Sequence, residues 1–165
     1  MSLTIASVNV NGIRAACKQR NENNPGMNAW LEQTPADIVL MQEVRATPDQ
    51  ATKALAPALE AGWHLELADA AAKGRAGVGI LSRTPLADVE IGFGSFTDAG
   101  RWIAATTRDI RVASLYLPSG DTDSPKLDEK YRFLDEFDSV LAENADKDLV
   151  IGGGWNICHR APDLK

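Results

Sequence analysis

Apolar residues in this chain gather in short runs that predict β-strands. The run at 38–41 (IVLM) lies shortly after Pro35 and contains β-branched residues, which is typical of a strand buried on both faces. Residues 3–10 and 149–151 have the same apolar character. Between 63 and 117, stretches of alternating apolar and polar residues follow one another without a helical interval, which predicts antiparallel strands.

Helices are predicted where apolar residues recur at spacings of three and four, in 27–31, 51–59 and 126–144. The last of these carries a single apolar stripe: Phe133, Leu134, Phe137, Val140 and Leu141. Thr47 and Gln50 form a capping box at the start of the middle helix, and Pro57 should kink or shorten it. Together, these elements predict one mixed α/β domain over 1–165.

Side chains that carry oxygen atoms follow three of the predicted strands. Asn9 and Asn11 close the first strand, Glu43 follows the run at 38–41, and Asn156 follows the glycines after the last strand. Ligands of open α/β sheets collect at the carboxyl ends of the strands, and side-chain oxygens bind hard cations such as Mg²⁺. We therefore expect the three ends to converge on one cation, although Glu43 would equally suit the start of a solvated loop.

The net charge of the chain is −6 at pH 7. This charge disfavours a generic nucleic-acid binder, because affinity for phosphates usually comes from lysine and arginine. The charge is unevenly distributed, however, since residues 73–111 contain six basic and four acidic side chains. A local basic rim is thus compatible with an acidic protein.

Cys17 and Cys158 lie far apart and lack the spacing of metal ligands. Two such cysteines are typical of reduced thiols in an intracellular protein. No apolar run approaches the length that spans a membrane, and the N-terminus has no signal-peptide core. We therefore expect a cytoplasmic protein without a membrane partner.

Five short sequences occur in the order of a known family. They are 7–15 (SVNVNGIRA), 37–43 (DIVLMQE), 77–82 (GVGILS), 116–120 (YLPSG) and 155–156 (WN). Together they resemble the exodeoxyribonuclease III and apurinic/apyrimidinic endonuclease branch of the endonuclease/exonuclease/phosphatase superfamily. The resemblance extends over essentially the whole chain.

This resemblance implies an α/β fold, the N-terminal portion of a two-sheet α/β sandwich with helices outside mixed sheets. It also implies a DNA repair nuclease that hydrolyses DNA phosphodiesters as a 3′–5′ exonuclease and an abasic-site endonuclease. The implied cofactor is Mg²⁺, with Mn²⁺ as an alternative, and the implied partner is double-stranded DNA with abasic sites or free 3′ ends. Arg75 and Arg101 would contact the DNA backbone, unless they are simply exposed surface arginines.

The resemblance further assigns roles to individual residues. Glu43 is the expected metal carboxylate, in agreement with its place after a strand, and Asn9 would orient the metal shell. Tyr116 would hydrogen-bond the scissile phosphate, and Asn156 would position the group beside it. One carboxylate, together with water and substrate phosphate, is a usual way to hold Mg²⁺.

Two departures from the family pattern affect the expected activity. The family has an aspartate where this chain has Gly154, and that aspartate prepares the attacking water. The family also continues past the position of Lys165, to an aspartate–histidine pair that completes the site. We therefore expect this chain to be inactive as written. The alternatives are a phosphoesterase of the same fold with a non-DNA substrate, a non-catalytic fragment that binds DNA or protein, and, disfavoured by the antiparallel stretches, a doubly wound nucleotide-binding domain.

A partial domain of this family would leave apolar sheet surface uncovered. The expected core positions are these: Leu3, Ile5, Val39, Met41, Leu115 and Val150. Because large exposed apolar patches are rare on monomers, we expect the chain either to form a homodimer through the uncovered face or to remain partly molten.

Overall fold

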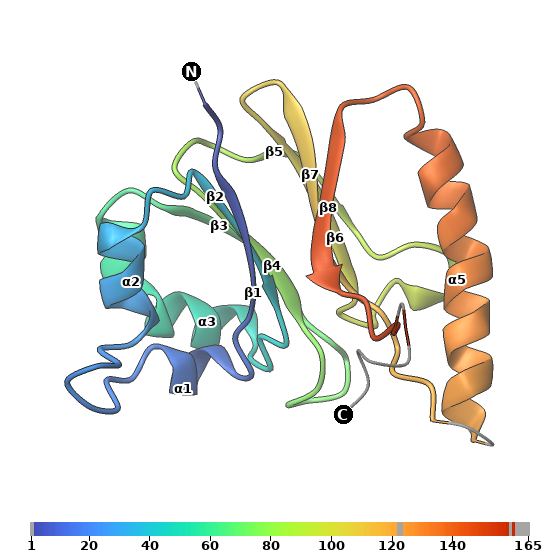
Figure 1. Ribbon diagram of the computed structural model, residues 1–165, viewed down its shortest axis with the longest axis horizontal. Coiled ribbons are helices and arrows are strands. Elements are labelled where there is room, and N and C mark those ends of the chain that lie inside the picture. The colour runs from blue at the N-terminus through green and yellow to red at the C-terminus, as the bar shows by residue number, and fades with distance from the viewer. Residues whose placement is uncertain (1, 122–123, 159, 161–165) are drawn as a thin grey trace.

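Two four-stranded sheets form the centre of the molecule in the computed structural model, which describes residues 2–121, 124–158 and 160 (Figure 1). The first sheet has the order β1 (Ile5–Asn9), β2 (Ile38–Gln42), β4 (Val78–Ser82) and β3 (His64–Ala68). The second has the order β5 (Ala87–Ile91), β6 (Trp102–Thr107), β7 (Ile110–Tyr116) and β8 (Leu149–Gly154). β1 pairs with β2 in parallel, as β7 does with β8, and the other pairs are antiparallel.

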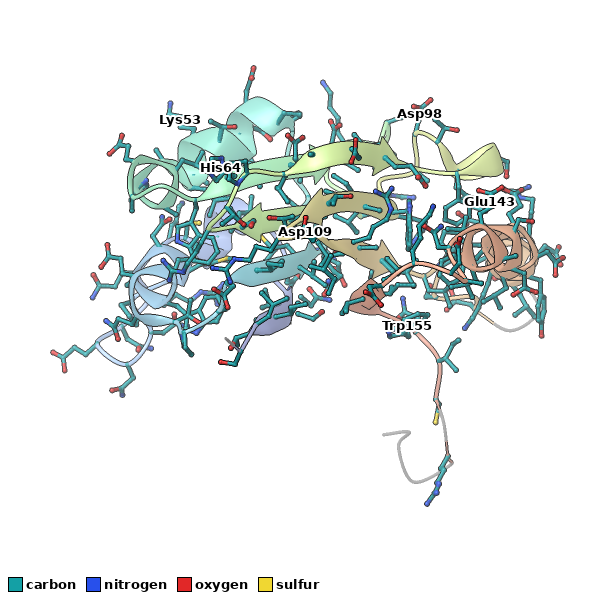
Figure 2. The ribbon with its side chains drawn as sticks, turned by 90° about the horizontal axis from the view of Figure 1, so that it is seen from above. Lys53, His64, Asp98, Asp109, Glu143 and Trp155 are labelled. Atoms are coloured by element: carbon teal, nitrogen blue, oxygen red, sulfur yellow. The ribbon has the colours of Figure 1, made fainter. Side chains whose placement is uncertain are left out.

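The sheets lie face to face with helices on both outer sides, so the molecule has four layers. Four short helices cover the first sheet: α1 (Ile13–Ala16), α2 (Met27–Gln33), α3 (Pro48–Ala54) and α4 (Ala56–Glu60). The long helix α5 (Pro125–Glu143) covers the second sheet with the 3₁₀ turn η1 (Gly94–Phe96). Figure 2 shows these layers from above, with Lys53 of α3 and Glu143 of α5 at opposite ends. The predicted α/β sandwich is confirmed.

Local sequence signals account for several elements. All five residues of β2 are buried, as expected of a strand covered on both faces. Thr47 and Gln50 form the predicted capping box at the start of α3. The helical stretch is interrupted at Leu55, two residues before Pro57, because a proline cannot donate the helical hydrogen bond and clashes with the preceding turn.

The apolar stripe of α5 is narrower than predicted. Phe133, Phe137 and Val140 are buried against the second sheet, whereas Leu141 is 41% exposed. Asn144 continues the buried row instead, and its amide donates to the carbonyl of Val140 at 2.8 Å. Residue 141 is turned by about 100° from residue 140 around the helix axis, so it lies on the flank of the row.

The glycines after the last apolar run belong to β8, which corrects the prediction that this strand ends at Ile151. A Cβ atom at Gly152 would lie 2.7 Å from Leu40 Cδ1, and one at Gly153 would lie 2.3 Å from the carbonyl oxygen of Leu115. At Gly153 the backbone of β8 therefore approaches the backbone of β7 too closely for a side chain, and at Gly152 the space is filled by the side chains of Leu40 and Ser7, a recognised use of glycine within strands.

The sheets cover each other, so the prediction of a large uncovered face is wrong. The core between them consists mainly of these residues: Ile38, Leu40, Ile80, Ile103, Ala105 and Val112. Val39 and Met41 are buried beneath the helices of the first sheet, and Leu115 is buried beneath α5. Leu3 and Ile5 are half-buried, and Val150 on the edge strand β8 is 38% exposed. Among the described residues, no helix is long and apolar enough to cross a membrane.

Candidate active site

Glu43 lies immediately after β2, where the chain turns sharply with φ of 52°. Its side chain is 14% exposed, and its Oε1 atom accepts a hydrogen bond of 2.8 Å from the amide of Asn9, at the end of β1. The guanidinium of Arg45 forms an ion pair with Oε2. Because β1 and β2 are parallel, their carboxyl ends meet at one edge of the sheet, which brings Asn9 and Glu43 together as predicted.

The surroundings of Glu43 keep its carboxylate ionised. Burial alone would raise the pKa of Glu43, but hydrogen bonding from Asn9 and Tyr116 and the positive charge of Arg45 outweigh burial and lower it. An ionised carboxylate is a hard oxygen donor suited to Mg²⁺. The described residues contain no group of three or more His, Cys, Asp or Glu side chains able to hold a metal, so any cation here would depend on Glu43, water and substrate oxygens.

Asn9 supports the carboxylate through both ends of its amide. While its Nδ2 donates to Glu43, its Oδ1 accepts from the backbone N–H of Asn11 at 3.0 Å. Asn11 has φ of 44°, a left-handed conformation that asparagine tolerates better than most residues. In this geometry Asn9 orients Glu43, and its Oδ1 is held in place by the N–H of Asn11.

Tyr116 reaches the same place from the second sheet, since it is the last residue of β7. Burial and the neighbouring Glu43 carboxylate raise the pKa of Tyr116, against smaller opposing effects of Asn156 and Arg101. Arg101 donates to the carbonyl oxygen of Tyr116 at 3.2 Å, and its guanidinium carbon lies 5.4 Å from the centre of the Tyr116 ring. The phenol therefore stays protonated at neutral pH and can donate a hydrogen bond.

Asn156 follows β8 and completes the cluster. Its side chain interacts with the Tyr116 phenol, and its Nδ2 donates to the carbonyl of Leu117 at 2.7 Å. Lys130 of α5 donates to the backbone carbonyl of Asn156 at 2.7 Å. Trp155, labelled in Figure 2 where the chain leaves β8, packs against Phe137 with ring centres 6.3 Å apart.

A side chain at position 154 would face this cluster, but the residue there is glycine. A Cβ atom on Gly154 would lie 3.1 Å from Cδ2 and 3.4 Å from Cε2 of Tyr116. A side chain at 154 would thus point at the tyrosine ring, with only a small shift of the ring. The backbone already presents this position to the site, and what it lacks is the carboxylate.

The predicted DNA-contacting arginines lie in different surroundings. Arg75 is exposed, and it lines a hollow of about 490 Å³ with Arg14, Arg45 and Lys73, which we call the basic hollow. An adjoining hollow is lined by Arg14 and Arg45 together with Lys18 and Lys53. Arg101, by contrast, has a side chain that is 18% exposed and is directed at Tyr116 and at Glu129, 3.8 Å away.

Arg45 and Lys130 were not selected from the sequence. Arg45 was recognisable in principle, because it is a cation two residues after a candidate metal carboxylate. Nothing in the sequence indicated a role for Lys130, because its contacts with Asn156 and Ser119 depend on how α5 packs.

A family model described as the endonuclease/exonuclease/phosphatase family matches residues 6–165. The chain belongs to the endonuclease/exonuclease/phosphatase family. Asn9, Glu43, Tyr116 and Asn156 all lie within the matched region.

Solved structures of family members share this architecture. An AP endonuclease from Archaeoglobus fulgidus is 28% identical with a TM-score of 0.85, over 99% of this chain and 61% of its own. A 3′ phosphatase from Neisseria, bound to a product DNA hairpin, is 28% identical with a TM-score of 0.79, over 97% of this chain and 60% of its own. A 3′–5′ exonuclease from Neisseria meningitidis is 29% identical with a TM-score of 0.76, over 95% of this chain and 58% of its own. This chain therefore spans about three-fifths of the length of these proteins.

Proposed function

We propose that this chain carries part of the active site of a DNA repair nuclease, which hydrolyses phosphodiesters as a 3′–5′ exonuclease and abasic-site endonuclease. The main support is the meeting of Asn9 and Glu43 from one sheet with Tyr116 and Asn156 from the other. The proposed substrate is double-stranded DNA with abasic sites or free 3′ ends. Family membership and the DNA-acting neighbours are consistent with it.

The proposed cofactor is Mg²⁺, with Mn²⁺ as an alternative, and Glu43 would hold it. The lowered pKa of Glu43 supports this, because the carboxylate is then ionised at neutral pH. Asn9 would keep Oε1 in place, and Arg45 would have to yield Oε2 to the cation. When bound, a divalent cation would screen the phosphate charge and stabilise the leaving oxygen.

Tyr116 and Asn156 would act on the scissile phosphate. The protonated phenol of Tyr116 can donate a hydrogen bond to a phosphate oxygen once it releases the Glu43 carboxylate, and the Asn156 amide is held beside it by Leu117. The basic hollow would receive the neighbouring backbone phosphates through Arg75 and the other cations of its wall. Arg101 would contribute chiefly by holding Tyr116, because its guanidinium is already engaged there.

We propose that the chain with Gly154 hydrolyses DNA very slowly. Attack by water requires a group that removes a proton, and a positioned general base commonly contributes about 10²–10⁴ in rate. Glycine has no such group, although the backbone orientation at 154 is suitable for one.

Extending the chain tests this proposal. We would append the C-terminal segment of the Archaeoglobus fulgidus endonuclease and measure Mg²⁺-dependent cleavage of abasic duplex DNA. The extended chain with Gly154→Asp should cleave this DNA. The extended chain that retains Gly154 should cleave it about 10²–10⁴ times more slowly. The extended chain with both Gly154→Asp and Glu43→Gln should not cleave it. Gly154→Asp in the unextended chain should restore little. Rapid cleavage by the unextended, unmodified chain would contradict the proposal.

A second candidate function is DNA binding without catalysis, which Gly154 specifically favours. The basic hollow would then be the main contact, and binding should weaken steeply with salt as counterions are released. Lys73→Gln with Arg75→Gln should reduce both affinity for duplex DNA and its salt dependence, measured by fluorescence anisotropy. Unchanged affinity would rule out the hollow as a binding surface.

We make three further proposals, which concern domain organisation, cellular location and oligomeric state. One domain over 1–165 is supported by the core that the two sheets share. A cytoplasmic location is supported by the free thiols of Cys17 and Cys158. The homodimer was expected through an uncovered sheet face; because the sheets cover each other, a homodimer would instead use the outer edges of β1 and β8, which pair with no strand among the described residues. Light scattering should then show a dimer that Val150→Lys dissociates, because lysine protects edge strands, whereas a monomer at high concentration would exclude it.

A further inference from the structure

A buried glutamine connects the two sheets directly beneath the candidate active site. Gln42, the last residue of β2, is 2% exposed. Its Nε2 donates to the carbonyl of Leu40 at 3.1 Å and, across the sheets, to the hydroxyl of Ser114 on β7 at 3.0 Å. Its Oε1 accepts a weaker bond of 3.4 Å from Ser7. Both ends of the amide are therefore paired, as is usual for buried polar groups.

Ser114 also donates a hydrogen bond across the two sheets. It is 0% exposed, and its Oγ donates to the backbone carbonyl of Met41 at 2.7 Å. Two hydrogen bonds of opposite direction thus join β2 to β7. Hydrogen bonds require a narrow range of distance and angle, whereas the apolar contacts elsewhere between the sheets are non-directional. The pair consequently restricts sliding of one strand over the other more than the same area of apolar packing would.

In each of the two strands, a candidate active-site residue lies close to Gln42 or Ser114 in the sequence. Glu43 follows Gln42 directly, and Tyr116 lies two residues after Ser114, on the same face of β7 because side chains alternate along a strand. Ser114 and Tyr116 both face the first sheet, while Leu115 between them faces α5. A displacement of Gln42 relative to Ser114 would therefore change the distance between Glu43 and Tyr116.

We propose that Gln42 and Ser114 are positioning residues, whose hydrogen bonds across the sheets set the place of Glu43 relative to Tyr116. The part that concerns metal binding rests on the function proposed above. The part that concerns the placement of the two side chains does not.

A second polar contact between the same sheets provides a matched control. Thr107 on β6 is buried, and its Oγ1 lies 2.6 Å from Thr84 Oγ1 and 3.3 Å from Ser82 Oγ on the side of the first sheet. Ser82 and Thr107 end β4 and β6 away from the candidate site. Thr107→Val removes this buried hydroxyl without changing side-chain shape, as Ser114→Ala removes the other.

Fluorine NMR of a fluorinated tyrosine tests the placement. The chain has two tyrosines, so in a Tyr131→Phe background the signal belongs to Tyr116. Ser114→Ala and Gln42→Leu should shift this signal toward its position in Glu43→Gln, whereas Thr107→Val should leave it unchanged. The affinity for Mn²⁺ should fall about 10-fold in the first two variants, in line with the effect of outer-shell partners of metal ligands.

The outcomes separate the two proposals. An unmoved signal in folded Ser114→Ala, or an equal shift in Thr107→Val, would overturn the positioning role. If Ser114→Ala does not fold, Ser114→Cys replaces it, and its weaker donor should give a shift of the same direction. Absence of Mn²⁺ binding by the unmodified chain would instead overturn the proposed function and leave the fluorine result to decide the positioning role.

Discussion

Lys130 of α5 donates a hydrogen bond of 2.7 Å to the backbone carbonyl oxygen of Asn156. The same ammonium lies 3.3 Å from the carbonyl oxygen of Ser119, which belongs to the loop that follows Tyr116. One cation on the outer helix therefore ties the loop that follows Tyr116 to the loop that carries Asn156. Asn156 has φ of 47°, a left-handed conformation that asparagine tolerates better than most residues, and the Lys130 hydrogen bond holds its carbonyl in place.

Lys130→Met should loosen both loops with little change in the rest of the molecule. We expect faster hydrogen exchange of backbone amides in peptides covering 116–121 and 152–158, measured by mass spectrometry. Lys126→Met is the control for 152–158, because Lys126 is on the same helix and its exposed ion pair of 2.6 Å is with Asp121 of the other loop. Equal exchange of 152–158 in the two variants would show that Lys130 does not hold the loop of Asn156.

Glu43→Gln should weaken Mn²⁺ binding more than any other single substitution in the described chain. The amide keeps the size of the side chain and removes the ionised oxygen, which is the principal donor available to a hard cation. Titration calorimetry with Mn²⁺ measures the effect. Glu129→Gln is the matched control, since it removes a nearby carboxylate that pairs with Arg101, and equal affinities of the two variants would remove Glu43 from the metal site.

Alanine should destabilise the chain by different amounts at two adjacent glycines of β8. A Cβ atom at Gly153 would lie 2.3 Å from a backbone oxygen, so Gly153→Ala should lower the free energy of unfolding by about 1–3 kcal/mol or more. At Gly154 the neighbour is the edge of the Tyr116 ring, 3.1 Å away, which can move. Gly154→Ala should therefore cost less than about 1 kcal/mol in urea unfolding. A similar loss at both positions would argue against room for a side chain at 154.

Cys17 is partly buried whereas Cys158 is exposed, so we expect burial to slow the reaction of the Cys17 thiol. Burial raises the pKa of Cys17 from 9.0 to about 11, so at pH 8 its thiolate fraction should be about 100-fold below that of an unburied thiol. The folded pKa lies above the unfolded one, so the stability contribution of neutral Cys17 should be complete below pH 9 and lost as pH rises through about 11.

Labelling with a thiol reagent in a Cys158→Ser background checks the prediction for Cys17. The reaction should be slow in the folded chain and rapid in denaturant, where burial is lost. Fast labelling in the folded chain at pH 8 would contradict it.

Short-range features of this protein could be predicted from the sequence. The buried strand β2, the capping box at Thr47, the interruption near Pro57 and the carboxylate at the end of β2 each depend on residues within a few positions of one another. Asn9 and Glu43 could be paired as well, because parallel neighbouring strands end at the same edge of a sheet.

Contacts between the layers were decided by the tertiary structure. The sequence did not reveal that the two sheets cover each other, that Arg101 turns toward Tyr116, or that Lys130 reaches Asn156. Gln42 and Ser114 are separated by 72 positions, and nothing near either residue indicates the other. Hydrophobic periodicity shows that a strand face is buried but not which element buries it, because apolar burial is non-directional; only the packed sheets determine which polar side chains meet.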